Sequence, residues 1–474
     1  MPAKINEAGA GANPSVLLKN LNKGRKATWI SENTAIFVAH GIGNQHPMET
    51  LEQFGKNLIK TYQKHLGAKN LTIEHRIRHK EAGNGERDWY DNYLRIKYSG
   101  SANYIDIYEY YWAHYTEGKA EWGDVNNWLQ GVTSGAKKFY KRNLGLSASM
   151  RDISVLTKSG FRYQLFINVM SRALLLAEAV WSGVRGLMGY IPLIGGILQR
   201  GYESYSRSIS HTLTNIIGDL VAYSVTDAKS KYYPIRRAIL DGCVKALLFL
   251  IEDGVVDSNG KFIGGKNGKR SYEKIIIAGH SLGSLVVYDA LNQINLMVNS
   301  CLVESYQSNG HCQTLNGRSL QDQLCGLITF GSPLDKSAFF LRENIPDDQF
   351  VRQQLLNHYM NFKQKDWTPD LASQTDFFPV ENQSTSRLLE NVPWRNYFDQ
   401  HDYVSGDLDY YGPLTNVDCS FSSKNWFRFT HSNYWDCMEF YDDIILNFLK
   451  PSSAKKPVVS ASLVRSLSND REGL

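Results

Sequence analysis

The feature that most constrains this chain is the stretch EKIIIAGHSLGSLVVYDA at residues 273–290. Lys274–Ala278 has the composition of a buried parallel strand, and Ser284–Met297 has the periodicity of a helix. Between them, Gly279-His280-Ser281-Leu282-Gly283 predicts a sharp strand-to-helix turn that holds out a serine hydroxyl. Glycine is expected at positions 279 and 283 because side chains there would collide with the neighbouring strand and helix. The pattern therefore predicts an α/β fold with Ser281 presented at the end of a central strand.

A second short strand with a glycine-rich end lies upstream. Thr34–Ala39 is apolar and runs into His40-Gly41-Ile42-Gly43-Asn44-Gln45. A glycine-rich loop after such a strand can turn backbone N–H groups toward an oxyanion that develops during attack on a carbonyl. We expect Ile42 to supply one N–H and Leu282, directly after the serine, to supply the other. The alternative is that His40-Gly41 only makes a tight turn.

Acidic residues cluster near the end of a further strand in WRNYFDQHDYVSG, residues 394–406. A serine on such a turn works with an acid and a histidine as a catalytic triad, and the three follow in the chain order serine, then Asp or Glu, then His. The acid of the triad is therefore expected in this stretch. Asp402 is our preferred candidate, and Asp399 is expected to cap the strand end instead. Asp407 and Asp409 follow, and we assign them to turns.

Four histidines follow the serine and are candidates for the base: His311, His358, His401 and His431. The first lies in a polar insertion at 300–323, and the second lies in a helical stretch. The third is adjacent to Asp402, and neighbours in sequence cannot easily point at each other. His431 remains, on a loop before the last helix, although a lone histidine is most often a surface or packing residue.

Together these pieces resemble the α/β-hydrolase superfamily, and in particular its lipase-like and phospholipase-like serine esterases. The matching landmarks span residues 34–445 and are His40–Gln45, Gly279–Gly283, Phe330-Gly331-Ser332-Pro333, Trp394…Asp399…Asp402 and His431…Tyr434-Trp435. The resemblance implies a mostly parallel central sheet flanked by helices, with a helical cap insertion. It also implies Ser281 as nucleophile, Asp402 as acid and His431 as general base. One departure is Tyr403, which stands where a proline usually follows the acid.

The resemblance implies hydrolysis of a carboxylic ester, such as a lipid, through an acyl-serine intermediate, with no metal and no organic cofactor. No His/Cys/Asp set has zinc-ligand spacing, and no glycine-rich loop reads as a phosphate- or dinucleotide-binding motif. The net charge of +5 is spread along the chain, so the charge pattern does not favour a nucleic-acid partner. Three alternatives stay open: a small-ester carboxylesterase or thioesterase, a toxin-like secreted phospholipase, and a non-catalytic hydrolase-fold protein that binds lipid or a partner.

The segment most informative about the substrate is Phe161–Leu198, which is strongly apolar, and Gly186–Leu198 within it carries no charge. The uncharged run is too short to span a bilayer. Three interpretations remain: a buried pair of cap helices, a lid that lines an acyl-chain site, and a segment in shallow peripheral contact with a membrane. The second and third favour a lipid ester over a small soluble one.

We divide the chain into four parts: 1–119, the first part of the core with the oxyanion loop; 120–235, a mainly helical cap or lid; 236–450, the rest of the core; and 451–474, a disordered tail. We expect helices at Thr50–Leu66 and Ile235–Asp253, edge strands at Leu71–Arg78 and Trp89–Tyr98, and core strands at Tyr104–Tyr111 and within Gly326–Pro333.

The N-terminus lacks the apolar run of a signal peptide. The six cysteines are scattered singly and read as reduced thiols, with a Cys301–Cys312 bridge left open. We therefore expect a cytoplasmic protein, or one exported without a Sec signal peptide, and membrane association stays open.

Overall fold

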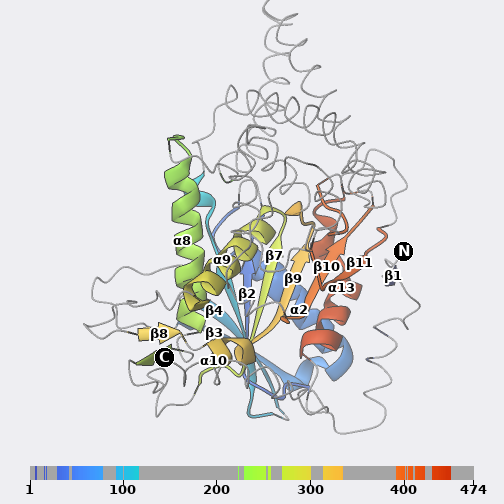
Figure 1. Cartoon of the computed structure of the whole chain (residues 1–474). Coiled ribbons are helices and arrows are strands. Elements are labelled where there is room, and N and C mark those ends of the chain that lie inside the picture. The colour runs from blue at the N-terminus through green and yellow to red at the C-terminus, as the bar shows by residue number, and fades with distance from the viewer. Residues whose placement is uncertain are drawn as a thin grey trace, which may run out of the picture.

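The structure is a computed structural model of the whole chain (Figure 1). It describes residues 6–7, 15, 18, 29–41, 45–77, 92–99, 101–116, 223, 229–251, 255–257, 270–299, 313–315, 317–334, 391–400, 402, 404–408, 411–421 and 430–449. The apolar segment 161–198, most of the expected cap at 120–235, the cysteines at 301 and 312 and the tail at 451–474 lie outside the described residues.

A mostly parallel sheet of nine strands forms the centre of the described part. In chain order its strands are β1 (Asn6–Glu7), β2 (Thr34–Ala39), β3 (Leu71–Ile77), β4 (Asn92–Tyr98), β5 (Tyr104–Tyr110), β7 (Lys274–His280), β9 (Leu324–Phe330), β10 (Trp394–Phe398) and β11 (Thr415–Asp418). In space the order is β1-β11-β10-β9-β7-β2-β5-β4-β3. Neighbours from β11 to β5 are parallel, whereas β1, β4 and β3 pair antiparallel at the two margins. A separate antiparallel pair joins β6 (Val255–Asp257) to β8 (Gln313–Leu315).

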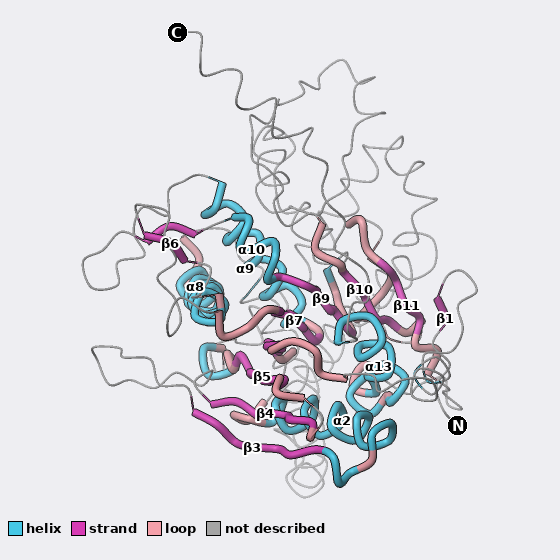
Figure 2. Tube along the Cα trace, turned by 90° about the horizontal axis from the view of Figure 1, so that it is seen from below, coloured by secondary structure: helices cyan, strands magenta, loops and turns pink. Residues whose placement is uncertain are grey.

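The helices form two layers, one on each face of the sheet (Figure 2). They are α2 (Glu49–Leu66), α8 (Tyr233–Leu250), α9 (Leu282–Asn299), α10 (Gly317–Gln323) and α13 (Met438–Ile444), which continues as a π-helical turn at Ile445–Leu449. Short 3₁₀ turns lie at Ala68–Asn70, Ala113–Tyr115 and Asn433–Asp436. Apolar residues of α8 and α9 share one buried cluster with one face of the sheet, and those of α2 and α13 share a second cluster with the other face.

The central strands are apolar throughout because both of their faces are covered. All six residues of β2 are buried, as are six of the seven in β7. A strand between two helix layers needs hydrophobic side chains at every position, in contrast to the alternation of a half-exposed strand. This pattern made β2, β7 and β9 visible in the sequence, and their predicted positions are confirmed.

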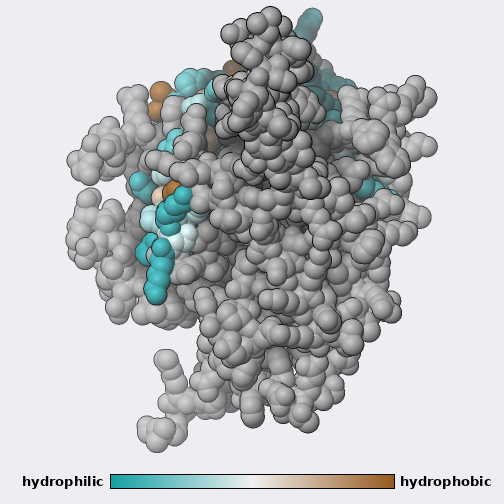
Figure 3. All heavy atoms as spheres, turned by 90° about the horizontal axis from the view of Figure 1, so that it is seen from above, coloured by the Kyte–Doolittle hydropathy of each residue, from teal (hydrophilic) through white to brown (hydrophobic). Residues whose placement is uncertain are grey.

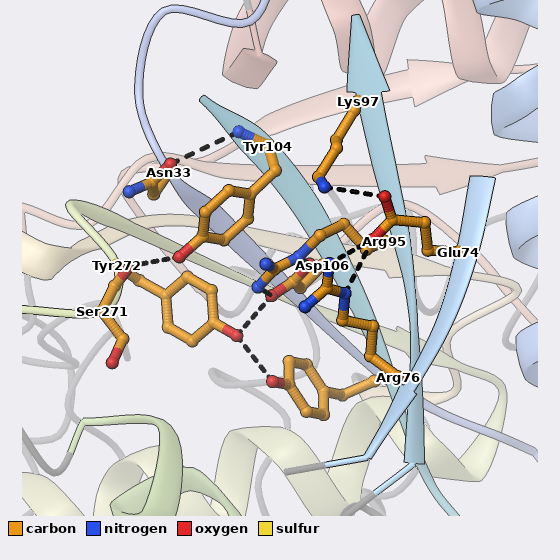
Figure 4. A network of polar contacts seen from close by, with 10 residues as sticks. Asn33, Glu74, Arg76, Arg95, Lys97, Tyr104, Asp106, Ser271 and Tyr272 are labelled. Carbon is orange, nitrogen blue, oxygen red and sulfur yellow. Dashed lines mark hydrogen bonds and ion pairs between the residues drawn. The ribbon is translucent and has the colours of Figure 1, made fainter. Parts of the chain in front are cut away.

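One charged side chain breaks this apolar rule in β5. Asp106 is fully buried, and Arg95 of β4 reaches both of its carboxylate oxygens at 2.7 Å (Figure 4). The Tyr272 hydroxyl donates a further hydrogen bond of 2.7 Å to Oδ2. A buried carboxylate is tolerated in such a strand because it is paired and hydrogen-bonded.

The connections of β2 and β7 run in opposite directions across the sheet. After β2 the chain passes through α2 and the β3–β4 hairpin and re-enters the sheet at β5, on one side of β2. After β7 it passes through α9 and enters at β9, on the other side of β7. In open α/β sheets such a topological switch point forms a crevice at the carboxyl ends of the two strands, where ligands bind. The two glycine motifs of the sequence follow these two strands.

The outcome for the remaining elements is mixed. The predicted helices and strands are present with shifts of a few residues, for example α8, which ends at Leu250 where the sequence predicted Asp253. The prediction that Trp89–Tyr98 is an edge strand is wrong, because β4 pairs with β3 on one side and with β5 on the other. The strands β1, β6, β8 and β11 and the helix α10 were not predicted. Among the described residues, no helix is long and apolar enough to cross a membrane. Seen from above, on the side to which the arrowheads of the central strands point, the visible described residues are mostly hydrophilic (Figure 3).

Candidate active site

Ser281 lies in a sharp turn between β7 and α9. Its φ of 51° is in the left-handed region, which is unfavourable for a residue with a side chain. The conformation is held from outside, because the Ser281 N–H donates to the Phe330 carbonyl of the neighbouring strand at 3.0 Å. A strained backbone that the surroundings impose is typical of functional turns. The strand–turn–helix geometry predicted for this serine is therefore present.

Glycine is required on both sides of the turn because backbone atoms approach too closely for a side chain. A Cβ at Gly279 would lie 2.6 Å from the Ser284 Cα of α9, and one at Gly283 would lie 2.5 Å from the Ala39 carbonyl oxygen of β2. Real Cβ atoms do not come this close to backbone. These contacts confirm the expected reason for the two glycines.

The end of β2 touches the turn directly. A Cβ at Gly41 would lie 2.6 Å from the Ser281 Cβ, so the upstream glycine loop begins against the serine. The Ser281 hydroxyl is buried and has no hydrogen-bond partner among the described residues. Leu282 is the first residue of α9, and the first N–H groups of a helix have no partner within the helix. Ile42, the other expected donor, lies outside the described residues.

His431 contacts Asp402, as the sequence predicted. The imidazole Nδ1 is 2.9 Å from Oδ2 of the carboxylate, and both side chains are buried. The second carboxylate oxygen accepts the Val404 N–H at 2.9 Å. Because a carboxylate oxygen accepts, the Nδ1 of His431 carries the proton, which leaves Nε2 as the basic nitrogen.

Two hydroxyl groups extend this pair into a chain of hydrogen bonds. The Tyr434 hydroxyl donates to Asp402 Oδ2 at 2.9 Å, and it is also 2.9 Å from the Ser405 hydroxyl. A phenol has one proton, so Ser405 must be the donor to Tyr434. The Asp402 oxygen that binds the imidazole thus accepts a second hydrogen bond, from Tyr434, which itself accepts one from Ser405. In such a chain each hydrogen bond polarises and strengthens the next. Sequence reasoning missed this role of Tyr434 and Ser405.

Asp399 faces different partners. One of its oxygens accepts the Phe421 N–H at 2.6 Å, and the other accepts the Thr430 hydroxyl at 3.2 Å. It therefore ties the end of β10 to the residue before His431. This matches the expectation that Asp399 caps the strand end.

The histidine loop and the serine turn meet at one edge of the sheet through residues adjacent to each of them. The His280 Nε2 donates to the His431 carbonyl at 3.2 Å, and the two imidazole rings are 4.9 Å apart. Gly331 directly follows the residue that binds the Ser281 N–H, and a Cβ there would lie 3.1 Å from the His431 Cε1. The structure thus joins the candidate base and acid directly and brings the candidate nucleophile near them at the carboxyl ends of β7, β9 and β10. No hydrogen bond joins the Ser281 hydroxyl to His431 Nε2.

Two further histidines are buried beside the turn in the neutral form. Burial, with a smaller effect of the neighbouring His431, lowers the pKa of His280 to about 3. Burial likewise lowers the pKa of His40 to about 4. The His40 Nδ1 donates to the Gly41 carbonyl at 2.7 Å, while Nε2 accepts the Trp112 N–H at 3.0 Å. His40 therefore fixes the first carbonyl of the glycine loop.

Glu109 fixes the other end of that loop. Its carboxylate accepts the Met48 N–H at 2.6 Å and the Thr50 N–H at 3.1 Å, at the start of α2. No side chain of the N-cap residue itself supplies this bond. A carboxylate at a helix N-terminus is favourable, but burial raises the pKa of Glu109 to about 7. Sequence reasoning missed this residue, whose signal was an acidic side chain inside a core strand.

The remaining chemical candidates are few. Among the described residues, no group of three His, Cys, Asp or Glu side chains could hold a metal ion. Four cysteines within the described ranges, at positions 243, 325, 419 and 437, are free thiols. The histidines at 311, 358 and 401 and the acid at 409 lie outside the described residues.

Comparisons of the chain with protein-family models, with curated proteins and with solved structures give no match.

Proposed function

We propose that this protein is a serine ester hydrolase of the α/β-hydrolase fold, in which Ser281, His431 and Asp402 act as nucleophile, base and acid. The observation that carries the proposal is the strained Ser281 turn, held against the edge of the sheet where His431 and Asp402 form a buried pair. A strand order with the switch point beside the serine supports the same fold.

The chemistry follows from the assigned proton positions. The Nε2 of His431 would accept the Ser281 proton as the hydroxyl oxygen attacks the ester carbonyl, and it would return the proton to the leaving alcohol. Asp402 holds the ring in the required tautomer and stabilises the imidazolium that forms. The Leu282 N–H, at the positive end of α9, would stabilise the oxyanion, together with the Ile42 N–H. Water activated by His431 then cleaves the acyl-serine.

We further infer a lipid ester as the substrate class. This inference rests on the sequence of Phe161–Leu198, which is apolar enough to line an acyl-chain site or to contact a membrane. A helical cap or lid in this part of the chain would place it over the carboxyl ends of the strands. A small-ester carboxylesterase is the alternative that the substrate profile would identify.

The nucleophile is tested with a fluorophosphonate probe, which reacts only with activated serines. We expect labelling of the native protein and none of Ser281→Ala, with Ser332→Ala as a matched control that keeps the label. Absence of labelling in the native protein would favour a non-catalytic binding role. Hydrolysis of p-nitrophenyl esters of rising chain length, beside phospholipid vesicles, then separates a lipid ester from a small one.

A further inference from the structure

The strand β3 forms one margin of the sheet. It pairs antiparallel with β4 along all seven residues, and no other described strand pairs with it (Figure 2). A strand in this position presents a row of backbone N–H and C=O groups that a further strand can pair with. Native edge strands are often blunted against such pairing by charged side chains, by proline or by bulges. The strand β3 carries charges of both signs, Glu74 and Arg76, whose order along the strand matters for pairing.

One face of β3 carries exposed apolar side chains. Ile73 is 45% exposed and Ile77 is 41% exposed, and these are the exposed large hydrophobic residues of the described part. Because side chains alternate along a strand, both lie on the same face as His75 between them. Helix α2 covers the neighbouring strands β2, β4 and β5 on this side of the sheet. Two isoleucines thus remain in water at the outer margin.

The opposite face of β3 carries a pair of opposite charges. Arg76 Nε donates to Glu74 Oε2 at 2.7 Å, and Lys97 of β4 contacts the other oxygen of the same carboxylate at 2.7 Å (Figure 4). Glu74 and Arg76 therefore lie side by side at the margin, one residue on either side of His75. Both are accessible to an added strand.

The sequence Ile73-Glu74-His75-Arg76-Ile77 is complementary to itself in the antiparallel direction. When His75 lies opposite the same residue of a second copy, each Ile73 faces an Ile77 and each Glu74 faces an Arg76. A register centred on Glu74 or on Arg76 places like charges opposite each other, and so does a parallel, in-register arrangement. Like charges directly opposite across strands are destabilising, whereas apolar and opposite-charge pairs are stabilising. The pattern therefore favours a single register.

We propose that β3 is a self-association site, at which a second copy of this chain adds its own β3 in antiparallel register about His75. The two sheets then continue into one another across a two-fold axis. On one face the isoleucines of the two copies cover each other. On the other face Glu74 of each copy lies opposite Arg76 of the other copy, with Lys97 on the far side of each Glu74. The surface is remote from Ser281 and is independent of the function proposed above.

The association is expected to be weak and reversible. In this register only residues 73–77 of the two strands face each other, and pairing of so short an edge buries less surface than the roughly 1,200–2,000 Å² of stable protein–protein interfaces. We therefore expect the full-length protein to sediment as a monomer at low concentration and as a dimer at high concentration in analytical ultracentrifugation.

Charge exchange tests the register. Glu74→Arg alone places two arginines opposite each other, and Arg76→Glu alone places two glutamates opposite each other. Each variant should raise the dimer dissociation constant about tenfold or more, since two cross-strand pairs turn from attractive to repulsive. An equimolar mixture of the two variants restores both opposite-charge pairs and should dimerise again. Glu52→Arg and Lys56→Glu, which change an exposed charge pair on α2, are the matched controls and should dimerise like the native protein.

A cysteine at the two-fold axis gives a second measurement. Residues directly opposite in an antiparallel pair have Cα atoms about 4.5–5.5 Å apart, within the range of a disulfide. His75→Cys should form covalent dimers under mild oxidation much faster than Glu52→Cys or the native chain. Circular dichroism checks that every variant is folded. A native protein that stays monomeric at high concentration, a dimer indifferent to both charge variants, or equal crosslinking at positions 75 and 52 would each overturn the proposal.

Discussion

Acidification should destabilise this protein through two histidines and stabilise it through one glutamate. The perturbation is a shift from pH 7.5 to pH 5.0. His40 and His280 have pKa values lowered by burial to about 4 and about 3, against 6.5 in an unfolded chain. Below about pH 6.5 these two histidines bind protons in the unfolded chain but stay neutral in the folded state, so the free energy of unfolding decreases as the pH falls. At pH 5.0 this amounts to roughly 2 kcal/mol for each histidine.

Glu109 acts in the opposite direction. Burial raises its pKa from 4.5 to about 7, so the folded state takes up a proton before the unfolded chain does. Its contribution to stability therefore grows as the pH falls from about 7 to about 4.5, by roughly 2 kcal/mol at pH 5.0. The three groups together predict a net loss of roughly 2 kcal/mol between pH 7.5 and pH 5.0.

Urea unfolding at the two pH values, followed by tryptophan fluorescence, measures this difference. His280→Gln should reduce the acid loss by roughly 2 kcal/mol, whereas Glu109→Gln should increase it by a similar amount. The comparison between pH values removes whatever each substitution costs at neutral pH. The reasoning is refuted when the His280 and Glu109 variants change the acid loss in the same direction.

Two further substitutions test the hydrogen-bonded networks. Tyr434→Phe removes a donor to Asp402, and a hydrogen bond to a charged group contributes about 1.5–3 kcal/mol, so kcat/KM for ester hydrolysis should fall about 10- to 100-fold. Ser405→Ala, one bond further from the carboxylate, should cost less, and the reverse order would contradict the proposed chain. Arg95→Met leaves the buried Asp106 unpaired and should destabilise by about 3–5 kcal/mol in urea unfolding. The double variant with Asp106→Leu should be more stable than Arg95→Met alone, and a still lower stability would contradict the role of the pair.

The parts of the fold that sequence reasoning found are those with a local cause. The strands β2, β7 and β9 lie between two helix layers and must be apolar at every position. The strand β11 was missed because its four residues, TNVD, include only one that is buried. Its place depends on pairing with β10 and β1, which no local pattern records.

The residues of the candidate site divide in the same way, into those with a local sequence signal and those that depend on distant contacts. Ser281 could be predicted because the turn itself demands glycines around it, and those are visible in the sequence. The partners of His40 and Glu109 are far away in the sequence: His40 bonds to Trp112, 72 positions away, and Glu109 bonds to Met48, 61 positions away. No local pattern predicts such contacts. Yet one signal was present, since a charged residue in a strand buried on both faces must find a partner. Asp106 and Glu109 in YIDIYEYY are two such residues, and each has its own partners.

Asp399 and Asp402 are two buried carboxylates three positions apart that have different partners. Asp402→Asn presents either an amide N–H or a neutral oxygen to His431, so the imidazole loses the charge that fixes its tautomer. The proton can then sit on Nε2, where it blocks uptake of the Ser281 proton, and such a change costs about 10⁴-fold in rate. Asp399→Asn should instead loosen the contacts to Phe421 and Thr430 and lower the stability, with a smaller loss of rate in the protein that remains folded. The measurement is the rate of fluorophosphonate labelling per folded molecule. A greater loss in Asp399→Asn than in Asp402→Asn would make Asp399 the acid.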